Sequence, residues 1–148
     1  MRPRLSGVDE AVVAVIATYR PSPNVAELVR VVRNMVDRVV VADDASPCTY
    51  DKTLRDLSSI TDVQVRGFRD NQGIARSLNV GLQVANEIGT GWLLTLDQDT
   101  QLPDSYVDTL MTDAVQAQHE GIPVGVIAPR QIHDRAGKIT YPCGQRTR

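Results

Sequence analysis

Residues 12–17 of the chain read VVAVIA, an uninterrupted apolar run in which most residues are β-branched. Short runs of this kind are typical of strands that are buried on both faces, as in a parallel sheet. Four further runs of this character follow, at residues 38–42, 63–68, 92–96 and 124–128. We therefore predict a series of buried, mostly parallel strands.

Helical patterns fill the intervals between these runs. The first helix is expected to bury Val25, Leu28, Val29, Val32 and Val36. A short second helix follows Ser46, and a fourth runs from Ser105 to Gly121. The third, over residues 74–88, is expected to turn Ile74, Leu78, Leu82 and Ala85 inward although Gly81 lies within it. Strands that alternate with helices predict an α/β fold with a mostly parallel twisted sheet flanked by helices.

Composition narrows the function classes. The 148 residues suit one domain, which we place at residues 11–148 behind a flexible tail at residues 1–10. A net charge of −2 leaves no cationic excess for nucleic acid. Two cysteines are too few for a disulfide framework or a zinc site. Without an apolar leader or a membrane-spanning stretch, we expect a cytoplasmic protein; attachment at the inner face of the membrane through another part stays open.

Polar residues follow the predicted strands, at the edge where open α/β sheets bind ligands. They are Thr18, Tyr19 and Arg20 after the first strand, Asp43, Asp44 and Ser46 after the second, Asp70, Asn71, Gln72 and Gly73 after the third, and Asp97, Gln98 and Asp99 after the fourth. A turn-like cluster between Ile132 and Ile139 predicts a hairpin after Pro129. The convergence of acidic and polar residues at one edge predicts a binding site there.

Asp97 and Asp99 are the candidate metal ligands. In an extended segment, a spacing of two residues points both carboxylates to the same side. Mg²⁺ typically takes one or two carboxylates together with substrate phosphates. The alternative is a solvated turn that leads into the next helix.

Three other positions each allow two interpretations. Asp43 and Asp44 could recognise donor groups of a ligand, or one of them could cap a helix. Tyr19 could stack on a flat base or be an ordinary half-buried aromatic residue. Arg76 could lie beside phosphates, since helix N-termini attract anions, or be a solvated helix residue.

Several nucleotide-binding classes can be set aside. The turn after the first strand reads TYRPSPN and has no glycine, so a dinucleotide fingerprint is absent, and no P-loop motif occurs. A phosphoacceptor receiver domain is the main alternative. In that interpretation Asp43 and Asp44 would be the acidic pair, and Asp97, two strands later, would be the phosphoacceptor. This chain does not complete that pattern. Ala128-Pro129 stands where the hydroxyl residue of a receiver domain is expected, and the later lysine is also missing.

Four segments, in order, resemble family-2 glycosyltransferases of the GT-A type. Residues 17–20 (ATYR) are similar to the family's strand-end segment, and residues 41–46 (VADDAS) to its V-D-D/N-G-S segment, with Ala45 in place of glycine. Residues 71–81 match N-x-G-x-A-x-x-x-N-x-G, and residues 97–99 (DQD) resemble the D-x-D motif. The form DQD after LTL is similar to rhamnosyltransferases of this family. A GT-A, Rossmann-like nucleotide-sugar-binding domain is what the resemblance implies.

The resemblance also implies roles for these residues. The donor, a nucleotide-diphosphate sugar such as dTDP-rhamnose or a UDP-sugar, would be bound by Thr18, Tyr19, Asp43, Asp44, Asn71, Gly73, Arg76, Asp97 and Gln98. Mg²⁺ or Mn²⁺ would be held by Asp99 and Asp97, and the acceptor would be a glycan or a lipid-linked molecule.

The catalytic residue is not identified. The family's general base lies well downstream of D-x-D, and Asp134 stands in no recognisable base motif. We therefore expect this chain to be the nucleotide-binding half of a longer inverting enzyme; a non-catalytic nucleotide-sugar-binding module is the alternative.

Overall fold

A computed structural model describes residues 11–129, 132–133 and 139–140. The chain divides into two compact units at Asp104–Ser105, and each is described by itself. The predicted tail, the turn at residues 134–137 and Asp134 lie outside the described residues.

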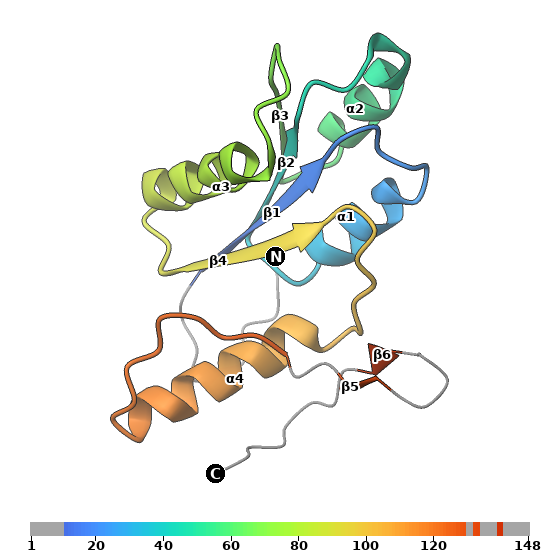
Figure 1. Cartoon of the computed structure of the whole chain (residues 1–148). Helices are drawn as coiled ribbons and strands as arrows, with labels where there is room; N and C mark the ends of the chain where they lie inside the picture. The colour runs from blue at the N-terminus through green and yellow to red at the C-terminus, as the bar shows by residue number, and fades with distance from the viewer. Residues whose placement is uncertain (1–10, 130–131, 134–138, 141–148) are drawn as a thin grey trace. The chain divides into compact units, whose positions relative to one another are not determined.

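The first unit is built on a four-stranded parallel sheet. Its strands are β1 (Val12–Thr18), β2 (Arg38–Asp43), β3 (Val63–Gly67) and β4 (Trp92–Asp97), arranged in the order β3-β2-β1-β4 (Figure 1). The predictions for these four strands are confirmed, each to within one residue at its end. The observed architecture is the predicted α/β fold.

Helices cover both faces of this sheet, which explains why its strands are apolar on both sides. On one face lie α1 (Val25–Arg33) and α2 (Asp51–Ser58), the latter preceded by the 3₁₀ turn η1 (Cys48–Tyr50); on the other lies α3 (Ile74–Ile88) (Figure 1). The central strands are fully buried from Val13 to Ile16 and from Val39 to Ala42. The predicted apolar face of α1 is confirmed, because Val25, Leu28, Val29, Val32 and the following Val36 are all buried.

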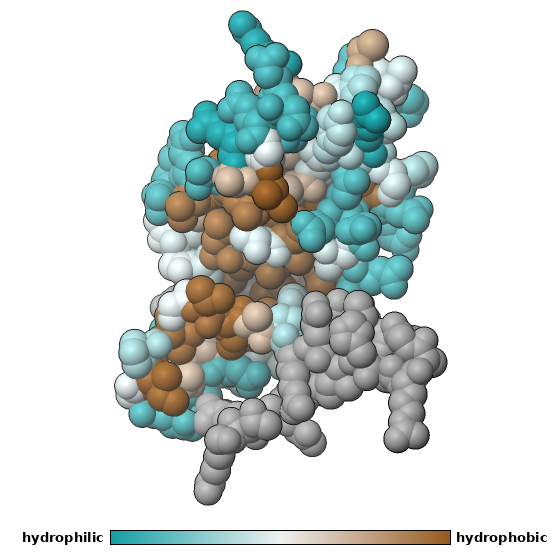
Figure 2. All heavy atoms as spheres, in the orientation of Figure 1, coloured by the Kyte–Doolittle hydropathy of each residue, from teal (hydrophilic) through white to brown (hydrophobic). Residues whose placement is uncertain are grey.

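The face that α3 turns inward differs from the prediction. Its buried residues are Ser77, Gly81, Val84 and Ala85. Ile74 and Leu82 are 57% and 48% exposed, so the prediction was wrong for these two residues. Figure 2 shows hydrophobic surface over the region of α3 and β4.

Gly81 explains why α3 turns this face, and not the predicted one, toward the sheet. An ideal Cβ at Gly81 would lie 2.7 Å from Cγ1 and 2.9 Å from Cγ2 of Val15 in β1, and closer still to its Cβ. The backbone of α3 thus rests directly on β1, which requires glycine at this position. The helix is oriented by this close approach, and two of its large apolar side chains are left outside.

Ser77 lies one turn before Gly81 and is buried, with a hydroxyl oxygen that makes no hydrogen bond in the described part of the chain. Because a buried polar group without a partner is unfavourable, Ser77→Ala is expected to raise the free energy of unfolding by about 1 kcal/mol. Urea unfolding measures this change. A loss of stability on substitution would show that the hydroxyl has a partner.

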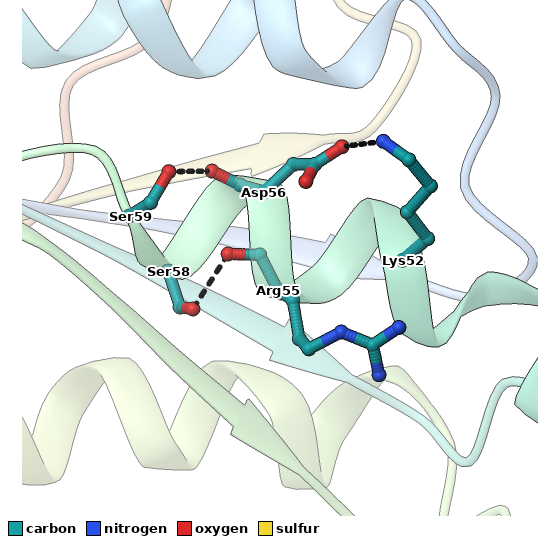
Figure 3. Close-up of polar contacts among 5 residues, drawn as sticks. All are labelled: Lys52, Arg55, Asp56, Ser58 and Ser59. Carbon is teal, nitrogen blue, oxygen red and sulfur yellow. Dashed lines mark hydrogen bonds and ion pairs between the residues drawn. The ribbon is translucent and has the colours of Figure 1, made fainter.

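The exposed side of α2 is held by local interactions (Figure 3). Lys52 Nζ lies 2.6 Å from Asp56 Oδ2 one turn later. At the end of the helix, the hydroxyls of Ser58 and Ser59 donate to the carbonyls of Arg55 and Asp56 at 2.7 and 2.6 Å. These two hydroxyls add to the bonds that the Ser59 amide makes to the same carbonyls, at 3.2 and 3.3 Å, and so reinforce the end of the helix.

The second unit contains α4 (Tyr106–His119) and the antiparallel pair β5 (Ile132–His133) and β6 (Ile139–Thr140). The helix expected between Ser105 and Gly121 and the hairpin after Pro129 are confirmed. The strand predicted at residues 124–128 is wrong, because that segment has no regular structure. Its apolar residues include Val126, which is almost fully exposed, so an apolar run with Gly125 inside it does not make a strand here.

Candidate functional site

The loops after β1, β2, β3 and β4 all leave the sheet at one edge. The paired registers Thr18 with Asp43 and Ala17 with Asp97 bring three of the strand ends level with one another. The strand order reverses direction between β1 and β4, since β2 and β3 add on one side of β1 and β4 adds on the other. Such a switch point at the carboxyl edge is where ligands bind in open α/β sheets.

The Asp43 carboxylate is turned into the protein. It is only 2% exposed and accepts hydrogen bonds from Thr18 Oγ1 at 3.1 Å, from the Ser46 amide at 2.9 Å and from the Ser46 hydroxyl at 2.6 Å. Oδ1 accepts two of these bonds. Asp43 therefore shapes the loop after β2 and ties it to the end of β1.

The Asp44 carboxylate holds the loop in front of α3. It is 6% exposed and accepts hydrogen bonds from the amides of Gln72 at 2.7 Å and Gly73 at 2.8 Å. Its backbone carbonyl also accepts from the side-chain amide of Asn71 at 3.3 Å. Asp44 thus fixes the start of α3 rather than capping the helix that follows it in sequence.

Two residues other than glycine adopt a positive φ in these loops. Ala45 has φ 62° and Arg20 has φ 51°. The left-handed region is unfavourable for residues with a Cβ, which explains why the related pattern has glycine where this chain has Ala45. The two loops are joined, because the Arg20 amide donates to the Ser46 hydroxyl at 2.7 Å.

Tyr19 offers an aromatic ring at this edge. It is 41% exposed, and the Arg20 guanidinium carbon lies 5.0 Å from the centre of its ring. Arg76, in the first turn of α3, is also exposed, with its guanidinium carbon 5.9 Å from the centre of the Phe68 ring. The flat, partly exposed Tyr19 ring, with one cationic group beside it, can stack on a planar ligand.

The Asp97–Asp99 segment is a turn, which was the alternative interpretation, and the expectation of an extended segment was wrong. The Thr100 amide donates to the Asp97 carbonyl at 3.1 Å, which places Gln98 and Asp99 at the corners of the turn. The side chains of Asp97 and Asp99 are both exposed.

Gln98 joins this turn to the end of β1. Its Oε1 accepts from the Tyr19 amide at 3.0 Å, and its Nε2 donates to the Tyr19 carbonyl at 3.2 Å. Gln98 was predicted to contact a nucleotide sugar, and the structure places its amide on the Tyr19 backbone.

A pocket of about 450 Å³ opens beside the same turn, between the β1–α1 loop, α1 and the chain after β4. It is lined by Ser22, Asn24, Glu27, Leu28, Val31, Gln98, Asp99, Thr100, Gln101 and Leu102. Of the predicted site residues, this lining contains Gln98 and Asp99. Glu27 was not predicted, although its place shortly after the first strand was a usable signal. The lining has two carboxylates and no cationic side chain, so it suits uncharged, hydroxyl-rich groups better than phosphate.

The donor set at the turn suits a hard divalent cation that completes its shell with other oxygens. No group of three or more His, Cys, Asp or Glu residues that could hold a metal occurs in the part of the chain that the structure describes. Protein carboxylates here would thus provide part of a coordination shell, and Mg²⁺ commonly takes one or two of them with phosphate oxygens and water.

Comparison with known proteins identifies the family. The model of glycosyl transferase family 2 matches residues 13–140. The chain belongs to this family. In this family-2 glycosyltransferase chain, the matched range includes β1 from its second residue, the other three strands of the sheet and the loops at its carboxyl edge.

One relative gives more detail. A dTDP-rhamnosyl transferase of Shigella flexneri (RfbF) is 30% identical over 98 residues, which are 66% of this chain and 32% of that protein. The chain thus spans about a third of the length of the relative that it matches. In the described residues of this chain, no helix has the length and apolar character needed to cross a membrane.

Proposed function

We propose that this chain binds a pyrimidine nucleoside-diphosphate sugar with Mg²⁺ or Mn²⁺, for inverting transfer of the sugar to a glycan or lipid-linked acceptor. Family membership supports glycosyl transfer from a nucleotide sugar. dTDP-rhamnose is the proposed donor, on the strength of the name of the Shigella relative. The observation that carries the proposal is the meeting of Tyr19 and the Asp97–Asp99 turn at the switch point of the sheet.

The nucleobase is assigned to Tyr19 and Asp44. The exposed Tyr19 ring provides a stacking surface. Each Asp44 oxygen accepts one hydrogen bond in the described structure, and a carboxylate oxygen can accept a second, here from a base N–H. Asp43 is the weaker candidate, because Thr18 and Ser46 already occupy its Oδ1.

The diphosphate is assigned to the Asp97–Asp99 turn, with Asp99 and Asp97 as metal ligands. A bound divalent cation would neutralise negative charge on the leaving diphosphate. The sugar is assigned to the adjacent pocket, where the Glu27 carboxylate can accept hydrogen bonds from hydroxyl groups and the Asn24 amide can either accept or donate them.

In the proposed reaction, the acceptor hydroxyl oxygen forms a bond to the anomeric carbon while the bond to the diphosphate oxygen breaks. The hydroxyl proton passes to a carboxylate base, and nucleoside diphosphate leaves. The described residues of this chain are assigned to donor binding. We propose that the chain by itself transfers sugar poorly.

Asp99→Asn tests this function. Titration calorimetry is expected to show that UDP and dTDP bind the wild type with Mg²⁺ or Mn²⁺, and more tightly than ADP or GDP. The substitution is expected to lower the metal-dependent affinity at least about tenfold, since even changes around metal ligands typically cost 10–100-fold. Asp104→Asn removes an exposed carboxylate from the same unit and is the matched control.

Two results would reject the proposal. Equal nucleotide affinity with and without metal would remove the metal assignment. A preference for purine nucleotides would remove the donor assignment, and phosphorylation of Asp97 by acetyl phosphate would support the phosphoacceptor alternative instead.

A further inference from the structure

We propose that Gln98 is a positioning residue that links the nucleobase side of the site to the metal side, by holding the Tyr19 backbone against the Asp97–Asp99 turn. The inference rests on the proposed function. It assigns to Gln98 a role through Tyr19 instead of a contact with the donor.

The side-chain amide of Gln98 takes the place of a backbone peptide group. The β1–β4 ladder ends at the pair Ala17 and Asp97, after which the Asp97–Thr100 turn carries the β4 backbone away. At that point Gln98 meets both polar groups of Tyr19, accepting from its amide at 3.0 Å and donating to its carbonyl at 3.2 Å. The ladder is thus continued for one more residue by a side chain.

This arrangement connects two loops that are otherwise separate in sequence. Asp97 and Asp99 flank Gln98, so a movement of the turn moves the group that fixes Tyr19. The loop after β1 is also unusual, since Arg20 has a positive φ. The Arg20 amide is held by Ser46, and the Tyr19 backbone is held by Gln98.

A direct contact of Gln98 with the donor is the competing explanation. The two bonds to Tyr19 occupy one acceptor site and one N–H of the side chain, which leaves one of each. A direct contact and a positioning role differ in one measurable respect. If Gln98 acts through Tyr19, its loss matters little once the Tyr19 ring is gone.

A double-mutant cycle measures this difference. UDP affinity in the presence of Mg²⁺ is determined by calorimetry for the wild type, Tyr19→Ala, Gln98→Met and the double variant. Methionine keeps the length of the side chain and removes both hydrogen bonds. Gln98→Met is expected to lower UDP affinity about tenfold in the wild type. In the Tyr19→Ala background it is expected to lower affinity less than about threefold, because residues that act as a unit are not additive.

A second measurement follows the Tyr19 amide by NMR. Its hydrogen exchange is expected to accelerate in Gln98→Met and to stay unchanged in Gln83→Met, the matched control, which is an exposed glutamine on α3 of the same unit and outside the pocket. Mg²⁺ with inorganic pyrophosphate, which has no base, is expected to shift the Tyr19 amide resonance in the wild type and not in Gln98→Met. A residue that served only the fold would not transmit this signal.

The outcomes separate the inference from the proposed function. If the wild type does not bind UDP with Mg²⁺, the proposed function fails and this inference fails with it. Two results overturn the positioning role while the proposed function stands, provided that UDP binds. One is that the affinity losses of Tyr19→Ala and Gln98→Met multiply in the double variant. The other is that the Tyr19 amide is unaffected by Gln98→Met.

Discussion

Replacing Gly81 with alanine is expected to lower the free energy of unfolding by about 1–3 kcal/mol, although alanine is the better helix former by about 1 kcal/mol. The added methyl would overlap Val15 of β1, whose Cγ atoms lie 2.7 and 2.9 Å from the ideal Cβ position. Since folded domains are stable by only about 5–15 kcal/mol, this is a large loss. Urea denaturation provides the measurement.

Two further variants make the interpretation specific. Gly67→Ala is the matched control, because no atom lies within 4 Å of the Cβ it would add, and its stability is expected to stay within about 0.5 kcal/mol of wild type. Val15→Ala is not expected to rescue Gly81→Ala, since the Cβ of Val15 is itself the nearest atom. A fully stable Gly81→Ala protein would show that α3 can move off the sheet at little cost.

Replacing Asp44 with alanine is expected to cost about 2–4 kcal/mol, because two backbone amides lose an ionised acceptor in a buried place. These are the amides of Gln72 and Gly73, at 2.7 and 2.8 Å from its carboxylate. Gly73 directly precedes α3, so the loss is also expected to loosen the first turn of that helix. Thermal unfolding measures the first effect, and hydrogen exchange at these amides measures the second.

Asp70→Ala is the control for this variant. Asp70 is an exposed carboxylate in the same loop, and its removal is expected to change stability by less than about 0.5 kcal/mol. Similar losses for the two aspartates would indicate that loop charge matters and that the contacts to Gln72 and Gly73 do not.

The sheet could be predicted because its signals are local. Residues 12–17 and 38–42 are apolar without interruption, and such runs are stable only when both faces are covered. Once the strands were placed, the carboxyl edge with Asp43, Asp44 and Asp97 followed from the geometry of parallel sheets. Residues 124–128 show the limit of this signal, because an apolar run of the same length has no regular structure there.

Other features depended on contacts that composition does not reveal. The inward face of α3 is set by the missing side chain of Gly81, whereas hydrophobic periodicity weighs only the side chains that are present. The turn at Asp97–Thr100 contains no glycine or proline, the two residue types that most strongly predict a turn. Which aspartate of a pair faces inward depends on donors such as Thr18 and Gln72, which come from distant segments.

The strand order also has a consequence for how the molecule forms. β1 and β2 leave the ribosome before β3 and β4 and lie at the centre, while β4 must return to β1 across the whole intervening chain, pairing Trp92 with Val12. Contacts between such distant segments close the largest loop of the sheet and are slow to form. Because Tyr19 and Gln98 meet across that pairing, the proposed donor site is expected to assemble last, after β1, β2 and β3 have joined.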